Sequence, residues 1–385
     1  MSVKWMPLWI FVPLLCAKAD CGAQKVFTQV NDLLRNRQYQ AAARTLDGLK
    51  HCALDPLDRF QSGWLYGRAR NFTAALEAFN AVPGNVPDLV THKYAIALSE
   101  FELADYRAAS DVLKTLQSQA EFDTKCANLL AVSYSKLALY RDAYLVLAQD
   151  IRNHPDDLPA YLNMVTVCAE GGNIAKAAEV ASEASRVFPQ SQEVFVVRGA
   201  ANMLLGHATE AGEDFSTAAR IAPQAAEPRF FLALTQYKLG KYADAVNVLQ
   251  SAIRDGIADP DVHYLMAECL LKLNPADTQK AIGQLNRAIE LNANSVSART
   301  LRGRLFLETG QPKAAVADLQ LANRLDATSR SAAYNLARAY RAEGRTADAE
   351  SLFKRLRSEP GDTLMELGDK RLNQALTQSP AGDPQ

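Results

Sequence analysis

Histidines and acidic residues, the side chains on which many enzymes depend, are scattered through the sequence without a catalytic spacing. The histidines show neither the H-E-x-x-H pattern nor any other metal-ligand spacing, and they are His51, His92, His154, His207 and His263. A G-x-S-x-G nucleophile elbow, a phosphate-binding loop and a dinucleotide fingerprint are also missing. The sequence therefore predicts a chain that is not an enzyme and that binds no metal or cofactor.

The cysteines predict structural roles and no redox site. Cys126, Cys168 and Cys269 fall within predicted helices without a C-x-x-C spacing, so we expect buried, inert thiols. Cys21 lies just before the first predicted helix and Cys52 near the end of the second, and these two points of a helical hairpin return to the same end. A disulfide between them would staple the first hairpin; two unpaired small residues are the alternative.

The elements that position these residues recur along the chain with a spacing of 34. Around Ala245, two amphipathic helices are joined at residues 240–242. Steps of 34 residues, with one step shorter by one and one longer by two, lead from Ala245 to nine further alanines: Ala42, Ala75, Ala109, Ala143, Ala177, Ala211, Ala281, Ala315 and Ala349. One hairpin cannot bury its apolar stripe alone, so neighbouring copies must supply the missing wall.

Two further columns accompany the alanines. Small residues dominate the eighth place of each copy, which holds Val30, Gly63, Ala97, Ala131, Val165, Gly199, Ala233, Ala267, Gly303 and Ala337. Mostly large residues stand four places after the alanine, at Leu46, Phe79, Leu113, Leu147, Ala181, Phe215, Leu249, Leu285, Leu319 and Phe353. Small side chains allow two helices to approach closely, and large ones fill the space between hairpins.

This spacing and these columns resemble the tetratricopeptide repeat family. A proline often closes a unit of that family, and Pro87, Pro155, Pro189 and Pro223 stand at that place here. The resemblance covers about residues 23–361, nearly the whole of the predicted mature chain. It implies an interaction domain that binds peptides or other proteins, and it names no reaction.

The predicted fold is all-α, a right-handed α-solenoid of about ten helix-turn-helix units. Within residues 23–361 the units begin near residues 23, 56, 90, 124, 158, 192, 226, 260, 296 and 330. Residues 362–378 are expected to form a helix that caps the last hairpin, with Leu364, Leu367, Leu372 and Leu376 on its apolar side. Residues 379–385 are expected to form a disordered tail.

The first helix of each unit carries a second stripe of residues at places two, five, nine and twelve. As in tetratricopeptide repeat proteins generally, this stripe is expected to line the concave face, where apolar and aromatic residues end in arginines. The predicted groove residues are Phe27, Phe60, Trp64, Tyr94, Phe230, Leu234, Tyr237, Tyr264, Arg304, Arg338 and Arg341. Such a groove suits an extended segment with hydrophobic anchors and an acidic end. Packing against the next hairpin is the alternative role for the aromatic residues.

The first nineteen residues have the pattern of an export signal. Lys4 is followed by an apolar run from Met6 to Ala17, and small residues surround a cleavage site before Asp20. The run is too short to span a bilayer, so the mature chain is predicted to be periplasmic or secreted without a transmembrane span. An uncleaved N-terminal membrane anchor is the alternative.

Charge and organisation complete the functional prediction. The net charge of −1 gives no field that would recruit nucleic acid. We expect a non-catalytic scaffold that binds a protein or peptide partner on its concave face outside the cytoplasm. An accessory subunit of an envelope enzyme or export system, for example in polysaccharide export, with the chemistry in its partner, is the alternative. The sequence indicates no oligomeric state.

Overall fold

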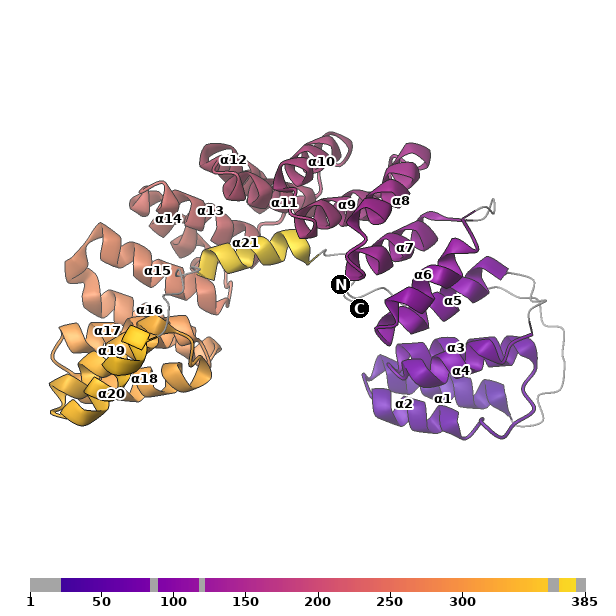
Figure 1. Ribbon diagram of the computed structural model, residues 1–385, viewed down its shortest axis with the longest axis horizontal. Helices are drawn as coiled ribbons and strands as arrows, with labels where there is room; N and C mark the ends of the chain where they lie inside the picture. The colour runs from indigo at the N-terminus through magenta and orange to yellow at the C-terminus, as the bar shows by residue number, and fades with distance from the viewer. Residues whose placement is uncertain (1–21, 84–88, 118–121, 359–366, 379–385) are drawn as a thin grey trace. The chain divides into compact units, whose positions relative to one another are not determined.

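The computed structural model describes residues 22–83, 89–117, 122–358 and 367–378. These residues form α-helices and one short 3-10 helix, with no β-strand among them (Figure 1). They confirm the predicted fold class, an all-α helical-repeat solenoid. The predicted leader and the predicted tail lie outside the described residues. The helices belong to two compact units, residues 1–187 with 377–385 and residues 188–376, and we describe each unit by itself.

Unit one contains five helical hairpins. Their helices are α1 (Ala23–Arg35), α2 (Tyr39–Asp47), α3 (Pro56–Arg68), α4 (Phe72–Asn80), α5 (Leu89–Glu102), α6 (Tyr106–Lys114), α7 (Thr124–Lys136), α8 (Tyr140–Asn153), α9 (Leu158–Glu170) and α10 (Ile174–Val187). Each hairpin packs on the next, and first helices also touch first helices, as α1 does with α3 and α7 with α9.

Unit two contains five further hairpins and one more helix. Its elements are α11 (Gln192–Leu204), α12 (Ala208–Ile221), α13 (Ala226–Lys238), α14 (Tyr242–Arg254), α15 (Pro260–Leu273), the 3-10 turn η1 (Pro275–Asp277), α16 (Thr278–Leu291), α17 (Val296–Glu308), α18 (Pro312–Leu325), α19 (Arg330–Ala342), α20 (Thr346–Ser358) and α21 (Leu367–Thr377). The same pairing recurs, with α13 against α15 and α17 against α19.

Short polar residues fix where many first helices begin. Asp55, Asp123, Ser191, Ser295 and Ser329 each precede such a helix, and each side chain accepts a hydrogen bond from the backbone N–H three residues later. This bond satisfies one of the donors that the first turn of a helix leaves free. The first residue of each of these helices is therefore fixed by a side chain next to it in the sequence, and this does not require contact with a neighbouring hairpin.

The alanine column lies at the centre of the packing, as the spacing predicts. Nine of its ten alanines are 0% exposed, and Ala349, in the last hairpin, is 2% exposed. A larger side chain at these places would push apart two helices that are already in contact. The ten methyl groups are therefore a shared packing constraint of both units.

In several hairpins a small residue of the second column faces a large residue of the third. Gly63 lies against the fully buried ring of Phe79, and Gly199 lies against Phe215, sixteen residues later in each case. Where the second column holds the larger Val165, the third column is reduced to alanine. These three hairpins thus divide the space between the two columns differently, whereas the first hairpin holds Val30 together with Leu46.

The turn within nine of the ten hairpins has a residue in the left-handed backbone conformation, and the α15–α16 hairpin turns through η1 instead. Gly240 has a φ of 73° there, and glycine adopts this conformation without steric cost. Unit one places Arg37, Arg70, Ala104 and Ala138 at the equivalent turns, with φ between 56° and 64°. Tertiary packing therefore imposes the turn even where the residue itself disfavours it.

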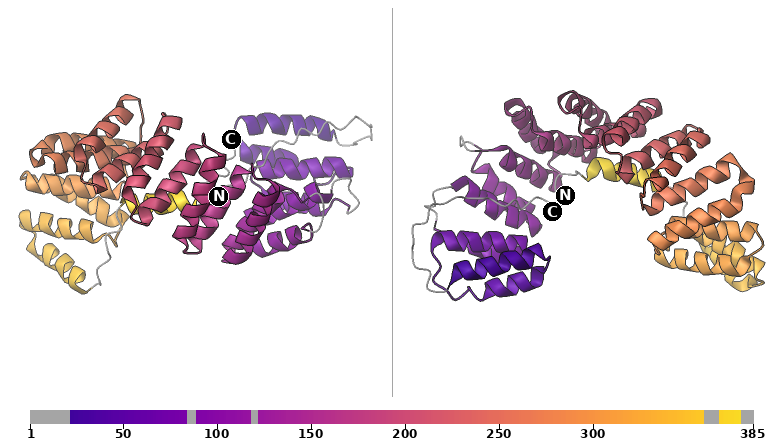
Figure 2. Two further views of the ribbon diagram at one scale, coloured as in Figure 1. Left: turned by 90° about the horizontal axis from the view of Figure 1, so that it is seen from above. Right: turned by 180° about the vertical axis from the view of Figure 1, so that it is seen from behind.

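The last helix departs from the prediction that residues 362–378 cap the final hairpin. Helix α21 begins at Leu367, and its hydrogen bonds to other described helices and their caps are with α13 and the start of α15. Figures 1 and 2 show it lying beside α13 and away from α19 and α20. At the start of α15, Asp259 and Asp261 both form ion pairs with Arg371 of α21.

Gly199→Ala is expected to lower the free energy of unfolding by roughly 1–3 kcal/mol, because the added Cβ would lie 2.8 Å from Cε1 of Phe215. Gly283→Ala is the matched control in the same unit: nothing lies within 4 Å of its added Cβ. There alanine is expected to stabilise the helix by roughly 1 kcal/mol. Urea unfolding followed by circular dichroism measures both variants, and equal shifts of the same sign would contradict the packing described.

Candidate interaction surface

The groove residues of α1 and α3 divide between core and surface. Phe27 is 1% exposed and belongs to the core of the first hairpins. Phe60 and Trp64 are half-buried, and their rings lie 5.4 and 5.9 Å from the ring of Phe79, which seals the hairpin core. Phe60 and Trp64 therefore pack against the core and also keep part of their rings accessible to solvent, whereas Phe27 is buried in the core.

Helix α5 carries a half-buried carboxyl group, that of Glu100. Oε2 of Glu100 is buried and has no hydrogen-bond partner in the described part of the chain. Burial, followed by the charges of Asp105 and Asp111, raises the pKa of Glu100 to about 7. Burial also raises the pKa of Tyr94, the predicted groove residue of this helix. Both side chains lie half-buried on α5.

In unit two, α13 presents its stripe in a similar mixed way. Phe230 and Leu234 are 1% and 4% exposed, whereas Tyr237 is half-buried with its ring 5.4 Å from that of Tyr242. The two most buried members do not offer free surface to a ligand. Tyr237 keeps part of its ring accessible, as an interaction residue must.

Tyr264 on α15 extends this surface to the next hairpin. Its hydroxyl donates a hydrogen bond to Oε1 of Glu268 at 3.2 Å. Burial, and then the charge of Glu268, raise the pKa of Tyr264, while the nearby Arg304 opposes the rise. Tyr264 therefore remains a neutral phenol at physiological pH, suited to hydrogen bonding and to aromatic contact.

Helix α21 occupies part of the same surface. Its Asp369 pairs with Lys238 at the end of α13. The guanidinium carbon of Arg371 lies 4.1 Å from the centroid of the Phe230 ring and 5.9 Å from that of Phe231. A cation over an aromatic face is attracted to the electrons of the ring. Phe230, a predicted groove residue, is thus covered by the chain itself.

Two carboxylates complete the site around Arg371. Nη1 of Arg371 lies 3.0 Å from Oδ2 of Asp261 and 3.4 Å from Oδ2 of Asp259. The other oxygen of Asp259 accepts from the backbone N–H groups of Asp261 and Val262 and so caps α15. One aspartate therefore both starts the helix and holds the arginine.

Burial tunes the acidic groups of this site. It raises the pKa of Asp261 and of Glu227 on α13, and the charge of Arg371 acts against the rise in both cases. Without the arginine, the half-buried Asp259 and Asp261 and the exposed Glu227 would face one another with less compensating charge. The local field therefore favours a cationic occupant.

The three predicted groove arginines do not act as one basic patch. Nε of Arg304 lies 3.8 Å from Glu308, and Arg338 donates a hydrogen bond to Asn335 at 3.3 Å. Arg341 stacks over the ring of Phe353, with 4.9 Å between the guanidinium carbon and the centroid. Each cation is held by its own neighbour, which the stripe pattern alone does not reveal.

A pocket at the last hairpin is a feature that the sequence analysis missed. It has a volume of about 670 Å³, and its lining residues on α19 and α20 include Arg330, Arg341, Arg357, Tyr334 and Phe353. Tyr334 is 52% exposed, the greatest exposure but one among the exposed large hydrophobic residues described. The sequence feature that could have indicated this pocket is the recurrence of arginine near the end of the array, without an acidic residue beside each arginine.

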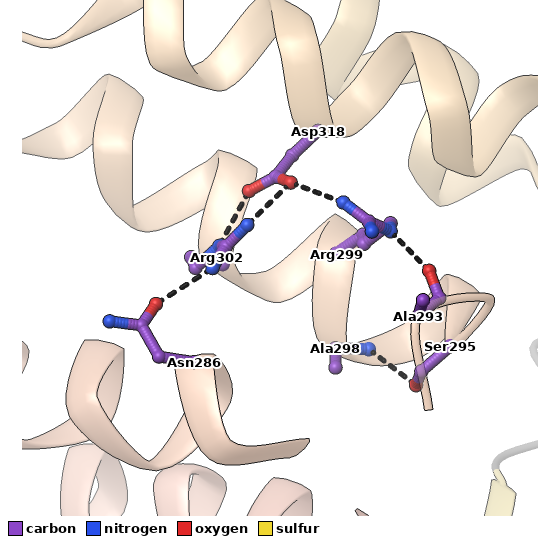
Figure 3. Close-up of polar contacts among 7 residues, drawn as sticks. All are labelled: Asn286, Ala293, Ser295, Ala298, Arg299, Arg302 and Asp318. Carbon is purple, nitrogen blue, oxygen red and sulfur yellow. Dashed lines mark hydrogen bonds and ion pairs between the residues drawn. The ribbon is translucent and has the colours of Figure 1, made fainter. Parts of the chain in front are cut away.

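Buried arginine and aspartate pairs hold hairpins together elsewhere in unit two. Asp318 on α18 accepts hydrogen bonds from Arg299 and Arg302 on α17, and Arg302 also donates to Asn286 on α16 (Figure 3). The side chain of Asp318 is 5% exposed. These arginines are therefore structural, because their hydrogen-bonding capacity is directed at neighbouring helices.

The cysteines among the described residues have structural environments. Cys126, Cys168 and Cys269 are free and buried, and burial raises the pKa of each thiol. Cys52 forms a disulfide bond. Its predicted partner, Cys21, lies outside the described residues, so that pairing stays a prediction.

The described ranges contain neither a candidate metal site nor a candidate membrane span. Among these residues no group of three or more histidine, cysteine or acidic side chains is placed to hold a metal ion. None of the helices in the same ranges combines the length and the apolar character needed to cross a bilayer.

Glu100→Gln is expected to change how stability depends on pH. Because the folded-state pKa of Glu100 is raised from 4.5 to about 7, the wild-type chain loses stability as the pH rises through this range. The variant cannot ionise there and should be more stable than wild type by about 1 kcal/mol near pH 8, after allowance for solvent screening, and nearly equal to it near pH 4. Urea unfolding at the two pH values tests this; a difference that is the same at both would contradict it.

Parts of the chain match two known protein families. Residues 162–226, 276–330 and 301–363 match the family described as tetratricopeptide repeat, and residues 215–288 match the family described as anaphase-promoting complex, cyclosome, subunit 3. No curated protein matches the chain.

Several solved structures are similar in fold. Yeast Tom70 is 16% identical, with 93% of this chain and 96% of that chain covered and a TM-score of 0.44. A tetratricopeptide repeat protein from Parabacteroides merdae is 15% identical, with 64% and 96% covered and a TM-score of 0.49. The APC/C hetero-tetramer Cut9–Hcn1 is 14% identical, with 93% and 84% covered and a TM-score of 0.48. With its family matches, its repeating columns and its stacked hairpins, the chain belongs to the tetratricopeptide repeat family.

Proposed function

We propose that this protein is a non-catalytic interaction scaffold that holds a protein or peptide segment on the second stripe of its first helices, outside the cytoplasm. The observation that carries the proposal is the position of α21. This eleven-residue helix already lies against α13 and the start of α15 through ion pairs and a cation–π contact. A surface that holds one helical segment has the chemistry to hold another.

A binding role also accounts for the half-buried aromatic residues. Phe60, Trp64, Tyr237 and Tyr264 combine a fixed position with an accessible edge. Aromatic side chains of this kind contribute large contact areas at low cost in conformational entropy, and they are common where interfaces gain most of their affinity.

The histidines that could have served catalysis are engaged in local structure. Nε2 of His92 lies 2.8 Å from the carbonyl oxygen of Phe79, and Nδ1 of His263 lies 2.8 Å from Oε1 of Gln284. Nδ1 of His154, the residue that follows α8, lies 3.0 Å from Oδ1 of Asp150 in the last turn of that helix. These contacts favour a scaffold over an enzyme.

Two features support a location outside the cytoplasm. The sequence of residues 1–19 has the pattern of an export signal, and Cys52 forms a disulfide, a bond typical of oxidising compartments. N-terminal sequencing of protein purified from its native cells is expected to give Asp20 as the first residue, in the envelope or secreted fraction. A chain that starts at Met1 and remains in the cytosol would contradict the proposed location.

Site-specific photo-cross-linking tests the binding role. A benzoylphenylalanine at position 237 is expected to capture a partner protein, which mass spectrometry then identifies. The control is the same group at position 145, on α8, where the native leucine is 54% exposed and lies outside the second stripe. Tyr237→Ala should then weaken binding of the identified partner by about 2 kcal/mol without lowering the melting temperature. Equal capture at both positions, or a variant that melts lower but binds normally when folded, would contradict the proposed surface.

A further inference from the structure

The contacts of α21 define what its docking site requires of an occupant. Resting on the function proposed above, we propose that the face formed by α13 and the start of α15 binds amphipathic helices that carry an arginine, and that α21 is the chain's own competitor for this site. The partner is thus a protein segment that resembles α21 in chemistry. The claim concerns unit two alone.

The charge of the site selects for a cation. Asp259 and Asp261 both contact Arg371, and Glu227 lies close enough for the arginine to lower its pKa against the effect of burial. The side chain of Arg371 is 17% exposed, so water screens these interactions less than it would on an open surface. An occupant without a positive charge would leave two partly buried carboxylates, Asp259 and Asp261, without a counter-ion.

The guanidinium shape matters as well as the charge. Arg371 uses one nitrogen for both aspartates, while its plane lies over the ring of Phe230. Arginine stacks on aromatic rings and directs several fixed donors at carboxylates, whereas lysine offers a compact and strongly hydrated ammonium group. The site should therefore prefer arginine to lysine.

The remaining contacts define a short pattern on a helix. Asp369, two residues before the arginine, meets Lys238 at the end of α13. Leu372 and Leu376 lie four residues apart on one side of α21 and are 0% and 1% exposed. A matching segment carries an acid, an arginine two residues later, and apolar residues one and five places after the arginine.

The site can exchange its occupant because α21 is a weak helix alone. Eleven residues are too few for a stable isolated helix in water, so α21 depends on docking for its structure. Its attachment to the chain gives it a high effective concentration, on the order of millimolar for a short linker. An external helix must therefore compete with this tethered helix for the face formed by α13 and the start of α15. A substitution that weakens the docking of α21 should make that face accessible to the external helix.

Fluorescence anisotropy with a labelled synthetic peptide of residues 362–378 tests the proposal on the full-length chain. The chain with Arg371→Glu, whose own helix is released, should bind the peptide at least about tenfold more tightly than the wild-type chain does. Lys370→Glu is the matched control, because it makes the same charge change at the adjacent, exposed residue and should behave like wild type. A peptide that itself carries Arg371→Glu should bind the released chain about thirtyfold more weakly than the natural peptide.

Hydrogen exchange shows whether the variants act as intended. In the Arg371→Glu chain the amides of α21 should exchange faster, while those of α13 and α15 stay protected; Leu372→Asp provides a second releasing variant if the first does not fold. Equal peptide binding by wild-type and released chains, or equal binding of both peptides, would overturn the inference. If the cross-linked partner still requires Tyr237 while the peptide binds no chain, this inference fails and the proposed function stands. If no partner is captured at position 237 although the peptide binds as expected, the proposed function fails and the inference about the docking site of α21 stands.

Discussion

Close contact between the two helices of each hairpin is the constraint on which the rest of the structure depends. The alanine column lets the second helix approach its neighbours, and the glycine or alanine at the eighth place of most units admits the large side chain opposite. Because interiors are packed nearly as densely as organic crystals, these positions leave little freedom in side-chain size. Once they are satisfied, the second stripe of each first helix is left outside the hairpin core and becomes available for recognition.

Electrostatic contacts act on top of this packing. Asp318 and its two arginines join the two helices of one hairpin, which the columns have already brought together, and the bond from Arg302 to Asn286 extends this contact to the preceding hairpin. Arg371 does something different, since it joins elements more than one hundred residues apart and so determines where the end of unit two lies. The same kind of ion pair therefore supports the repeat in one place and fills a recognition surface in another.

The repeat could be predicted from the sequence because each hairpin depends on short-range spacing. The alanines, the pairing of Gly199 with Phe215 and the caps before first helices are all visible as periodic patterns. The groove residues were only partly predictable. The stripe identifies which side of a helix Phe230 occupies, but its burial depends on a helix that approaches from a distant part of the chain.

The position of α21 shows what periodic patterns cannot supply. Its leucines predict an amphipathic helix but not the surface that receives it; that choice depends on Asp259, Asp261 and Lys238, whose charges carry no periodic signal.

The most direct measurement of the position of α21 is the distance between spin labels at Gln374 on α21 and Asp244 on α14, both exposed. A single narrow distribution in the free chain, broadened by an excess of the peptide of residues 362–378, is the result expected. A broad distribution without peptide, unchanged when peptide is added, would contradict the account.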